Sequence, residues 1–130
     1  MFEFVRNNSG QNFPVIEQRP AKASQKYVPG MLLNFANGVM TPATTAPQYV
    51  CAEKYDAPAA DPGDVSVYPI APGQQWRTKF AADGKALKAG EKVTIHTDFL
   101  QVTATTSSGV FTILEKLGDG STGTDVIGEF

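Results

Sequence analysis

Hydrophobic and polar residues alternate most clearly in the C-terminal half of the chain. Across residues 92–97, Val93 and Ile95 share one parity, and polar residues occupy the other. Strict alternation of this kind predicts a β-strand with one buried face. The phase of the alternation changes near Asp98 and Phe99, which predicts a tight turn or bulge before the next strand.

The rest of the chain has the same character of short strands joined by turns. Asn37-Gly38 lies between two apolar runs and predicts a two-residue hairpin. Residues 110–117 are apolar on both parities, so we expect this strand in the interior of a sheet. The predicted fold is therefore all-β, a single small barrel or sandwich of about seven to nine short strands. The candidate strands are residues 31–35, 39–43, 48–55, 65–71, 75–80, 92–97, 100–104, 110–117 and 126–130.

Residues 1–26 lack this regularity and are predicted to form an extended N-terminal arm, with the β domain covering residues 27–130. Two interpretations are open for the arm. It is either a disordered terminus or a segment that orders on a partner, in the end by adding a strand to a sheet edge. Disordered tails are usually poor in aromatic residues, so the phenylalanines favour the second interpretation, and we expect the β domain to fold without the arm. The expected partner-binding side chains of the arm are Phe2, Phe4, Val5, Phe13, Val15 and Ile16.

Length and charge narrow the class of protein. A chain of 130 residues suits one domain and can bury a core without cross-links. The net charge of −2 is unevenly distributed. Residues 1–30 carry four basic and two acidic side chains, whereas the remainder carries seven basic and eleven acidic ones. The basic residues are too sparse for a nucleic-acid-binding tail, so we expect no nucleic acid among the partners.

The scarcity of cysteine and of long apolar segments indicates the compartment in which the chain is made. Cys51 is the single cysteine, so no disulfide can form within the chain, as is common for proteins made in a reducing compartment. No N-terminal segment has the pattern of a signal peptide, and no apolar run approaches the ~20 residues of a membrane helix. We expect a soluble protein that is synthesised in the cytoplasm and has no membrane partner.

The candidates for catalysis and metal binding are weak. His96 and Asp98 would share a strand face, and Cys51 could complete a thiol–His–Asp set, but any chain with one His and one Cys offers this combination. The Gly-rich stretch with Asp119 and Asp125 lacks the pattern of an EF-hand loop. We therefore expect no catalytic residues, no metal site and no cofactor, and hence no enzyme.

Trp76 is a further candidate for partner binding. It precedes Arg77, and both residue types are enriched in interface hot spots. Trp76 also shares its parity with Thr78 and Phe80, as a residue of the core would. The sequence leaves both interpretations open.

The C-terminal third resembles bacteriophage head decoration proteins, also called capsid cement proteins. The resemblance rests on Gly90 and Val93 in one strand, on a second strand with Val102, Thr103 and Thr105, and on a last strand at Asp125-Val126-Ile127. Residues 27–44, YVPGMLLNFANGVMTPAT, are similar to the early part of such domains. The resemblance implies a small β-rich domain, often a homotrimer, on the outer surface of an icosahedral head, with an N-terminal arm that adds to a strand of the major capsid protein.

The expected function is therefore that of a structural capsid decoration protein, located on the outer surface of the virion, that binds the assembled head and stabilises it. The alternatives are another phage structural protein, from the tail or the head-completion machinery, or a carbohydrate-binding or adhesive β domain. The adhesive alternative requires exposed aromatic side chains grouped on one face, for which Trp76 and the tyrosines are the candidates.

Overall fold

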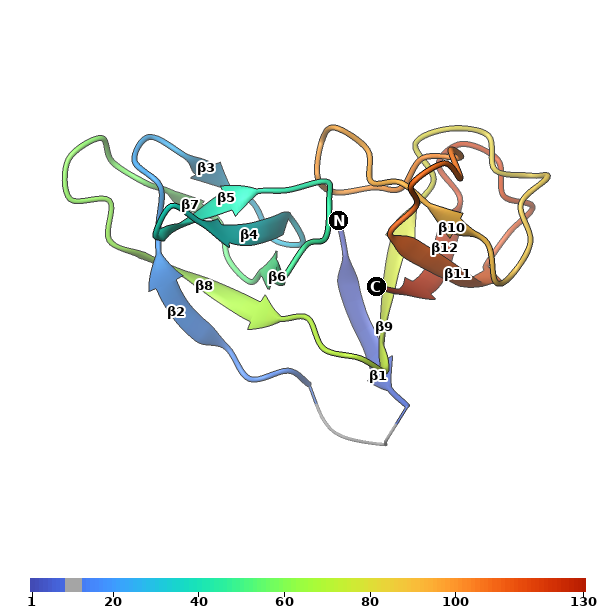
Figure 1. Ribbon diagram of the computed structural model, residues 1–130, viewed down its shortest axis with the longest axis horizontal. Helices are drawn as coiled ribbons and strands as arrows, with labels where there is room; N and C mark the ends of the chain where they lie inside the picture. Colours follow the sequence, from blue (N-terminus) through green and yellow to red (C-terminus); the bar gives the residue numbers. More distant parts are fainter. Residues whose placement is uncertain (9–12) are drawn as a thin grey trace.

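The structure, a computed structural model, describes residues 1–8 and 13–130. It confirms the all-β prediction, although the twelve strands of the described residues exceed the predicted number. They form two five-stranded sheets and one two-stranded sheet, and together these fit a β-sandwich (Figure 1). The strands are β1 (Glu3–Asn7), β2 (Glu17–Pro20), β3 (Lys26–Tyr27), β4 (Leu32–Ala36), β5 (Val39–Pro42), β6 (Tyr49–Cys51), β7 (Tyr55–Asp56), β8 (Asp64–Pro69), β9 (Gln74–Lys79), β10 (Lys92–Val93), β11 (Phe111–Lys116) and β12 (Asp125–Glu129).

Sheet A has the order β1-β9-β12-β11-β10, and its strand pairs are all antiparallel. The last strand in the sequence, β12, is the central strand of this sheet. Gly128 of β12 packs closely against β11. A Cβ atom at this position would stand 2.2 Å from the carbonyl oxygen of Thr112 and 2.5 Å from the ring of Phe111. Only glycine allows this approach, so Gly128 fixes how closely β11 and Phe111 pack on β12.

Sheet B has the order β2-β8-β6-β4-β5. A parallel bridge between Ala21 and Met40 joins its two edges, so the sheet curls toward a closed barrel. The predicted hairpin at Asn37 and Gly38 joins β4 to β5, and both residues have positive φ, 52° and 76°. Positive φ at both central residues is the conformation of a type I′ turn, which matches the twist of the flanking strands.

Strand β4 of sheet B has buried residues on both of its faces. Leu32 packs into the core that lies between sheets A and B, together with Phe80 and Phe111 of the sheet A side. Leu33 points the other way, into a second core inside the curled sheet, together with Tyr27 and Val67. Because neighbouring residues of a strand face opposite sides, this one strand contributes to both cores.

The segment that was predicted to be a loose arm contributes strands to both sheets. In Figure 1, β1 lies beside β9 in sheet A, and β2 lies beside β8 in sheet B. Residues 9–12 of the predicted arm lie outside the described residues. The sequence pattern concealed both strands for a physical reason. Strand β1 has a register shift between Phe4 and Arg6, and a bulge breaks regular alternation, while β2 is a short edge strand that ends at Pro20.

A turn at residues 96–101 links the two sheets. The carbonyl of Phe99 accepts a hydrogen bond from the Leu32 backbone N–H at 3.0 Å. The carbonyl of Leu100 accepts one from the Thr78 hydroxyl at 2.7 Å. Phe99 has a φ of 63°, a conformation that is uncommon for a bulky residue. This strained turn, which the phase change in the sequence predicted, therefore holds sheet B against sheet A.

Candidate functional site

Three of the predicted partner-binding residues form the most exposed apolar stretch of the described chain. Phe13 is 70% exposed, Val15 is 78% exposed and Ile16 is 52% exposed. They lie just before β2, whose pairing with β8 begins only at Glu17. We call residues 13–16 the apolar segment. Consecutive exposed apolar side chains of this size are a common mark of an interaction surface.

Phe2 and Trp76 occupy a different environment, since they are 2% and 1% exposed. The ring of Phe2 packs against Phe111 and Phe130, with centroids 5.6 Å and 5.5 Å away. Both residues are therefore part of the core between the sheets, which corrects the expectation that Phe2 lies on a free arm. For Trp76, the sequence left open an interface position and a core position, and the structure places its side chain in the core.

The remaining two predicted residues lie on β1. Phe4 is half-buried, and its ring meets Trp76 edge-on at a centroid distance of 5.5 Å. On its other side the ring of Phe4 lies 5.0 Å from that of Phe13. Val5 falls at the register shift of β1 and is 39% exposed. An aromatic row therefore runs from the buried Trp76 to the exposed Phe13.

A groove follows this aromatic row along the junction of the two sheets. Its volume is about 360 Å³. Four of the seven predicted residues line it, but Val5, Val15 and Ile16 do not. Sequence analysis did not predict this groove, because its walls come from distant parts of the chain. We call it the inter-sheet groove and define it by Phe2, Phe4, Phe13, Gly30, Tyr68 and Trp76.

The candidate thiol–His–Asp set is separated into local structural contacts. The Sγ of Cys51 donates a hydrogen bond to the carbonyl of Glu53 at 3.0 Å, and burial raises the pKa of this thiol to about 11. It is therefore protonated at neutral pH, whereas a cysteine nucleophile must be a thiolate. His96 lies beside Asp98 in the linking turn, with 3.2 Å between Nδ1 and Oδ1. No contact between Cys51 and His96 is present in the described part of the chain.

The side chain of Asp98 stabilises the turn that contains it. Its Oδ1 accepts hydrogen bonds from the backbone N–H of Leu100 and of Gln101, at 2.9 Å and 3.2 Å. Burial alone would raise the pKa of this carboxyl, but the hydrogen bonds from Leu100, Gln101 and His96 together lower it below its usual value. The charged carboxylate thus holds the strained turn that connects the sheets.

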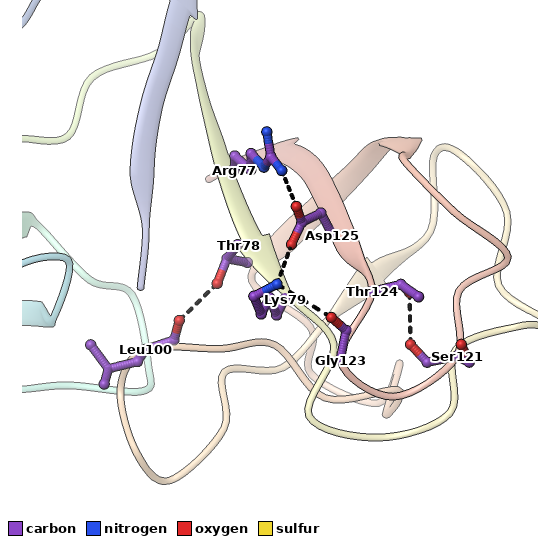
Figure 2. Close-up of polar contacts among 8 residues, drawn as sticks. All are labelled: Arg77, Thr78, Lys79, Leu100, Ser121, Gly123, Thr124 and Asp125. Carbon is purple, nitrogen blue, oxygen red and sulfur yellow. Dashed lines mark hydrogen bonds and ion pairs between the residues drawn. The ribbon is translucent and has the colours of Figure 1, made fainter.

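The carboxylates of Asp119 and Asp125 in the Gly-rich loop make separate contacts and do not form a common site. Figure 2 shows that Asp125 lies between the side chains of Arg77 and Lys79 of β9, with an ion pair to each. Hydrogen bonds from Lys79 and Arg77 lower the pKa of Asp125. Asp119 instead accepts hydrogen bonds from Ser121 within its own turn. Among residues 1–8 and 13–130, no three His, Cys, Asp or Glu side chains are grouped so that they could hold a metal ion.

Comparisons with known proteins do not assign the chain to a family. No protein-family model matches it, and neither a curated protein nor a solved structure does. Within the described residues, no helix is long and apolar enough to cross a membrane. The structural features that bear on function are therefore the apolar segment and the inter-sheet groove.

Proposed function

We propose that this chain is a structural protein of a bacteriophage head, a decoration protein that binds the outer surface of the assembled capsid and stabilises it. The observation that carries the proposal is the exposure of Phe13, Val15 and Ile16 in one short segment. The resemblance of the C-terminal third to decoration proteins supplies the kind of partner, the major capsid protein. A homotrimer on the virion surface is part of the proposal.

The fold changes how attachment is expected to occur. The resemblance implies a free arm that adds a strand to the capsid protein, but β1 and β2 already pair with β9 and β8 of the same chain. Attachment is therefore proposed through the side chains of the apolar segment. Burying an apolar side chain of this size contributes about 1.5–3 kcal/mol, and a segment held next to β2 loses less conformational entropy on binding than a free arm would.

Several weak contacts suffice when one oligomer presents several copies of the segment. Linked contacts of this kind raise avidity by about 10²–10⁴-fold over a single contact. The uneven charge adds long-range attraction, because residues 1–30 carry four basic and two acidic side chains, and this excess favours an acidic partner surface.

The test is co-sedimentation with purified heads of the bacteriophage that encodes the chain. The intact protein is expected to sediment with the heads and to raise the temperature at which they rupture. A triple variant with serine at Phe13, Val15 and Ile16 should lose most of this binding. The matched control is Phe35→Ala, which removes a side chain of β4 that is 47% exposed and should bind as the wild type does.

Different outcomes separate the alternatives. Binding to purified tails but not to heads would assign the chain to the tail or head-completion proteins. Retention on a glycan array without binding to any phage particle would support an adhesive domain. Equal head binding by the triple-serine variant and the wild type would refute the role of the apolar segment, and a monomer by light scattering would refute the trimer.

A further inference from the structure

The tip of the β4–β5 hairpin combines a reactive dipeptide with open surroundings. Asn37 and Gly38 are the two central residues of the turn, and both are exposed. A Cβ atom at residue 38 would have no atom within 4 Å. Among the described residues, neither the side chain of Asn37 nor the backbone N–H of Gly38 has a hydrogen-bond partner. No other group of the described chain therefore competes for these two groups or shields them.

An asparagine side chain in this position can react with the backbone nitrogen that follows it. The nitrogen of Gly38 loses its proton and attacks Cγ of Asn37, and the side-chain amide leaves as ammonia. The product is a five-membered cyclic imide, which water opens at either of its two carbonyls. Opening at Cγ gives aspartate, and opening at the backbone carbonyl gives isoaspartate. One water is consumed for each ammonia released, and no other reactant is needed.

The other asparagines that the structure describes are less suited to this reaction. Asn34 lies within β4, donates a hydrogen bond from Nδ2 to a backbone carbonyl at 3.2 Å and precedes the bulky Phe35. Asn8 accepts a hydrogen bond at Oδ1 from Gln75, and Asn7 lies within β1. A side chain on the following residue shields its backbone nitrogen, and Asn37 is the one asparagine of the sequence that precedes a glycine.

We propose that Asn37 is a site of spontaneous covalent modification, at which the folded protein forms aspartate and isoaspartate. The exposed hairpin presents the side chain and the attacking nitrogen to solvent, and the absence of a Cβ at Gly38 leaves the approach open. The inference does not depend on the capsid function.

Isoaspartate at this position would alter sheet B, because it adds one atom to the backbone of a two-residue turn. The φ values of 52° and 76° match a type I′ turn, which sets the register of the strands that it joins. Met40 of β5 depends on that register. It is fully buried, its carbonyl accepts a hydrogen bond from the Tyr27 hydroxyl at 2.6 Å, and it forms the bridge to Ala21 that closes the sheet. Formation of isoaspartate should therefore loosen the closure of sheet B.

The test is incubation of the intact folded protein at pH 8, well below its Tm, followed by tryptic peptide mapping with mass spectrometry. One tryptic peptide, residues 27–54, contains both Asn34 and Asn37, so the first residue is an internal control for the second. The mass gain of an amide-to-acid conversion should accumulate at Asn37, in two products that separate by chromatography, and Asn34 should stay unchanged. A parallel sample in urea gives the rate for the unfolded chain.

Two variants separate the chemistry from its structural effect. Gly38→Ala places a Cβ beside the attacking nitrogen and should slow the conversion severalfold or more. Asn37→Asp carries the new charge without the extra backbone atom, and Asp-Gly also suits a type I′ turn, so this variant should keep the Tm of the wild type. The isoaspartate form, isolated from the incubated sample, should unfold at a lower temperature than both.

The modification site is overturned if Asn37 is unchanged in the folded protein while it converts in urea, because the hairpin would then protect it. Conversion of Asn34 at the same rate as Asn37 in the folded protein would also overturn it. If the isoaspartate form and Asn37→Asp have equal Tm values, the predicted loosening of sheet B is wrong. The wild-type measurement decides the first question even if Gly38→Ala does not fold.

Discussion

Replacement of Phe2 by alanine tests whether the N-terminal residues belong to the folded body. Phe2 is 2% exposed and packs against Phe111 and Phe130 in the core between the sheets. Its backbone N–H also donates a hydrogen bond to the carbonyl of Gly30 at 3.1 Å, and the substitution leaves this bond in place. The change therefore isolates the contribution of the buried ring.

The expected loss is large. Truncating a buried phenylalanine to alanine costs about 3–5 kcal/mol, from the lost transfer free energy and the cavity that remains. The total stability of a domain is about 5–15 kcal/mol, so this single ring would account for about a fifth of it or more. For a chain of this length, each kcal/mol corresponds to roughly 3–5 °C in Tm, so Tm should fall by roughly 10–25 °C.

The matched control is the same substitution at Phe13, which is 70% exposed. Its cost should stay below about 1 kcal/mol, as for most surface positions. Both variants are measured by urea unfolding, followed by circular dichroism, and by thermal scans. Equal free energies of unfolding for Phe2→Ala and Phe13→Ala would refute the assignment of Phe2 to the core and would restore the free arm that the sequence predicts.

The remaining predictions concern backbone, charge and thiol. Gly128→Ala should destabilise the protein by about 1–3 kcal/mol, because the new Cβ would stand 2.2 Å from a backbone oxygen. Gly38→Ala should cost only about 1 kcal/mol, because Gly38 has a positive φ but no atom within 4 Å of the new Cβ. Chemical unfolding of the two variants compares these costs. Asp98→Asn should lower stability at pH 7 by about 1–2 kcal/mol. Because the folded pKa of Asp98 is lowered, this difference is fully present above the ordinary value of 3.8 and should vanish as pH falls through the folded pKa. A difference in stability between Asp98→Asn and the wild type that is the same at pH 3 as at pH 7 would contradict it. Cys51, with its pKa raised to about 11, should react with a thiol reagent at pH 8 much more slowly in the folded protein than in urea, and equal rates would show that the thiol is accessible.

Local patterns in the sequence were sufficient for some strands and misleading for others. The clearest alternation, over residues 92–97, yields only the two-residue strand β10, and the strand predicted over residues 100–104 is wrong, because Ile95 and Val102 form only isolated bridges. The alternation before Phe80 predicted β9, and Asn37-Gly38 predicted the hairpin of sheet B, because turn geometry depends on the conformational freedom of just these two residues. The phase change at Asp98 likewise marked the turn that links the sheets. The apolar segment could also be read from the sequence as a run of apolar residues without a strand pattern, and the structure leaves it exposed.

The fate of the N-terminal residues was decided only by tertiary structure. Strands β1 and β2 are edge strands with a bulge and a terminal proline, so neither has an alternation that could be recognised. Each becomes a strand only because β9 and β8, about 50 to 70 residues later in the chain, supply hydrogen-bonding partners. Phe2 is likewise buried only because Phe111 and Phe130 surround it.

The inter-sheet groove belongs to the same category. Sequence parity places Trp76 and Phe80 on one face of β9, but it does not determine whether that face meets a partner or another sheet of the same chain. The packing of sheet B on sheet A settles this, since it buries Trp76 and leaves Phe4 and Phe13 between the core and solvent. Hydrophobic alternation specifies which side chains must leave water, whereas the long-range pairing of strands specifies what covers them.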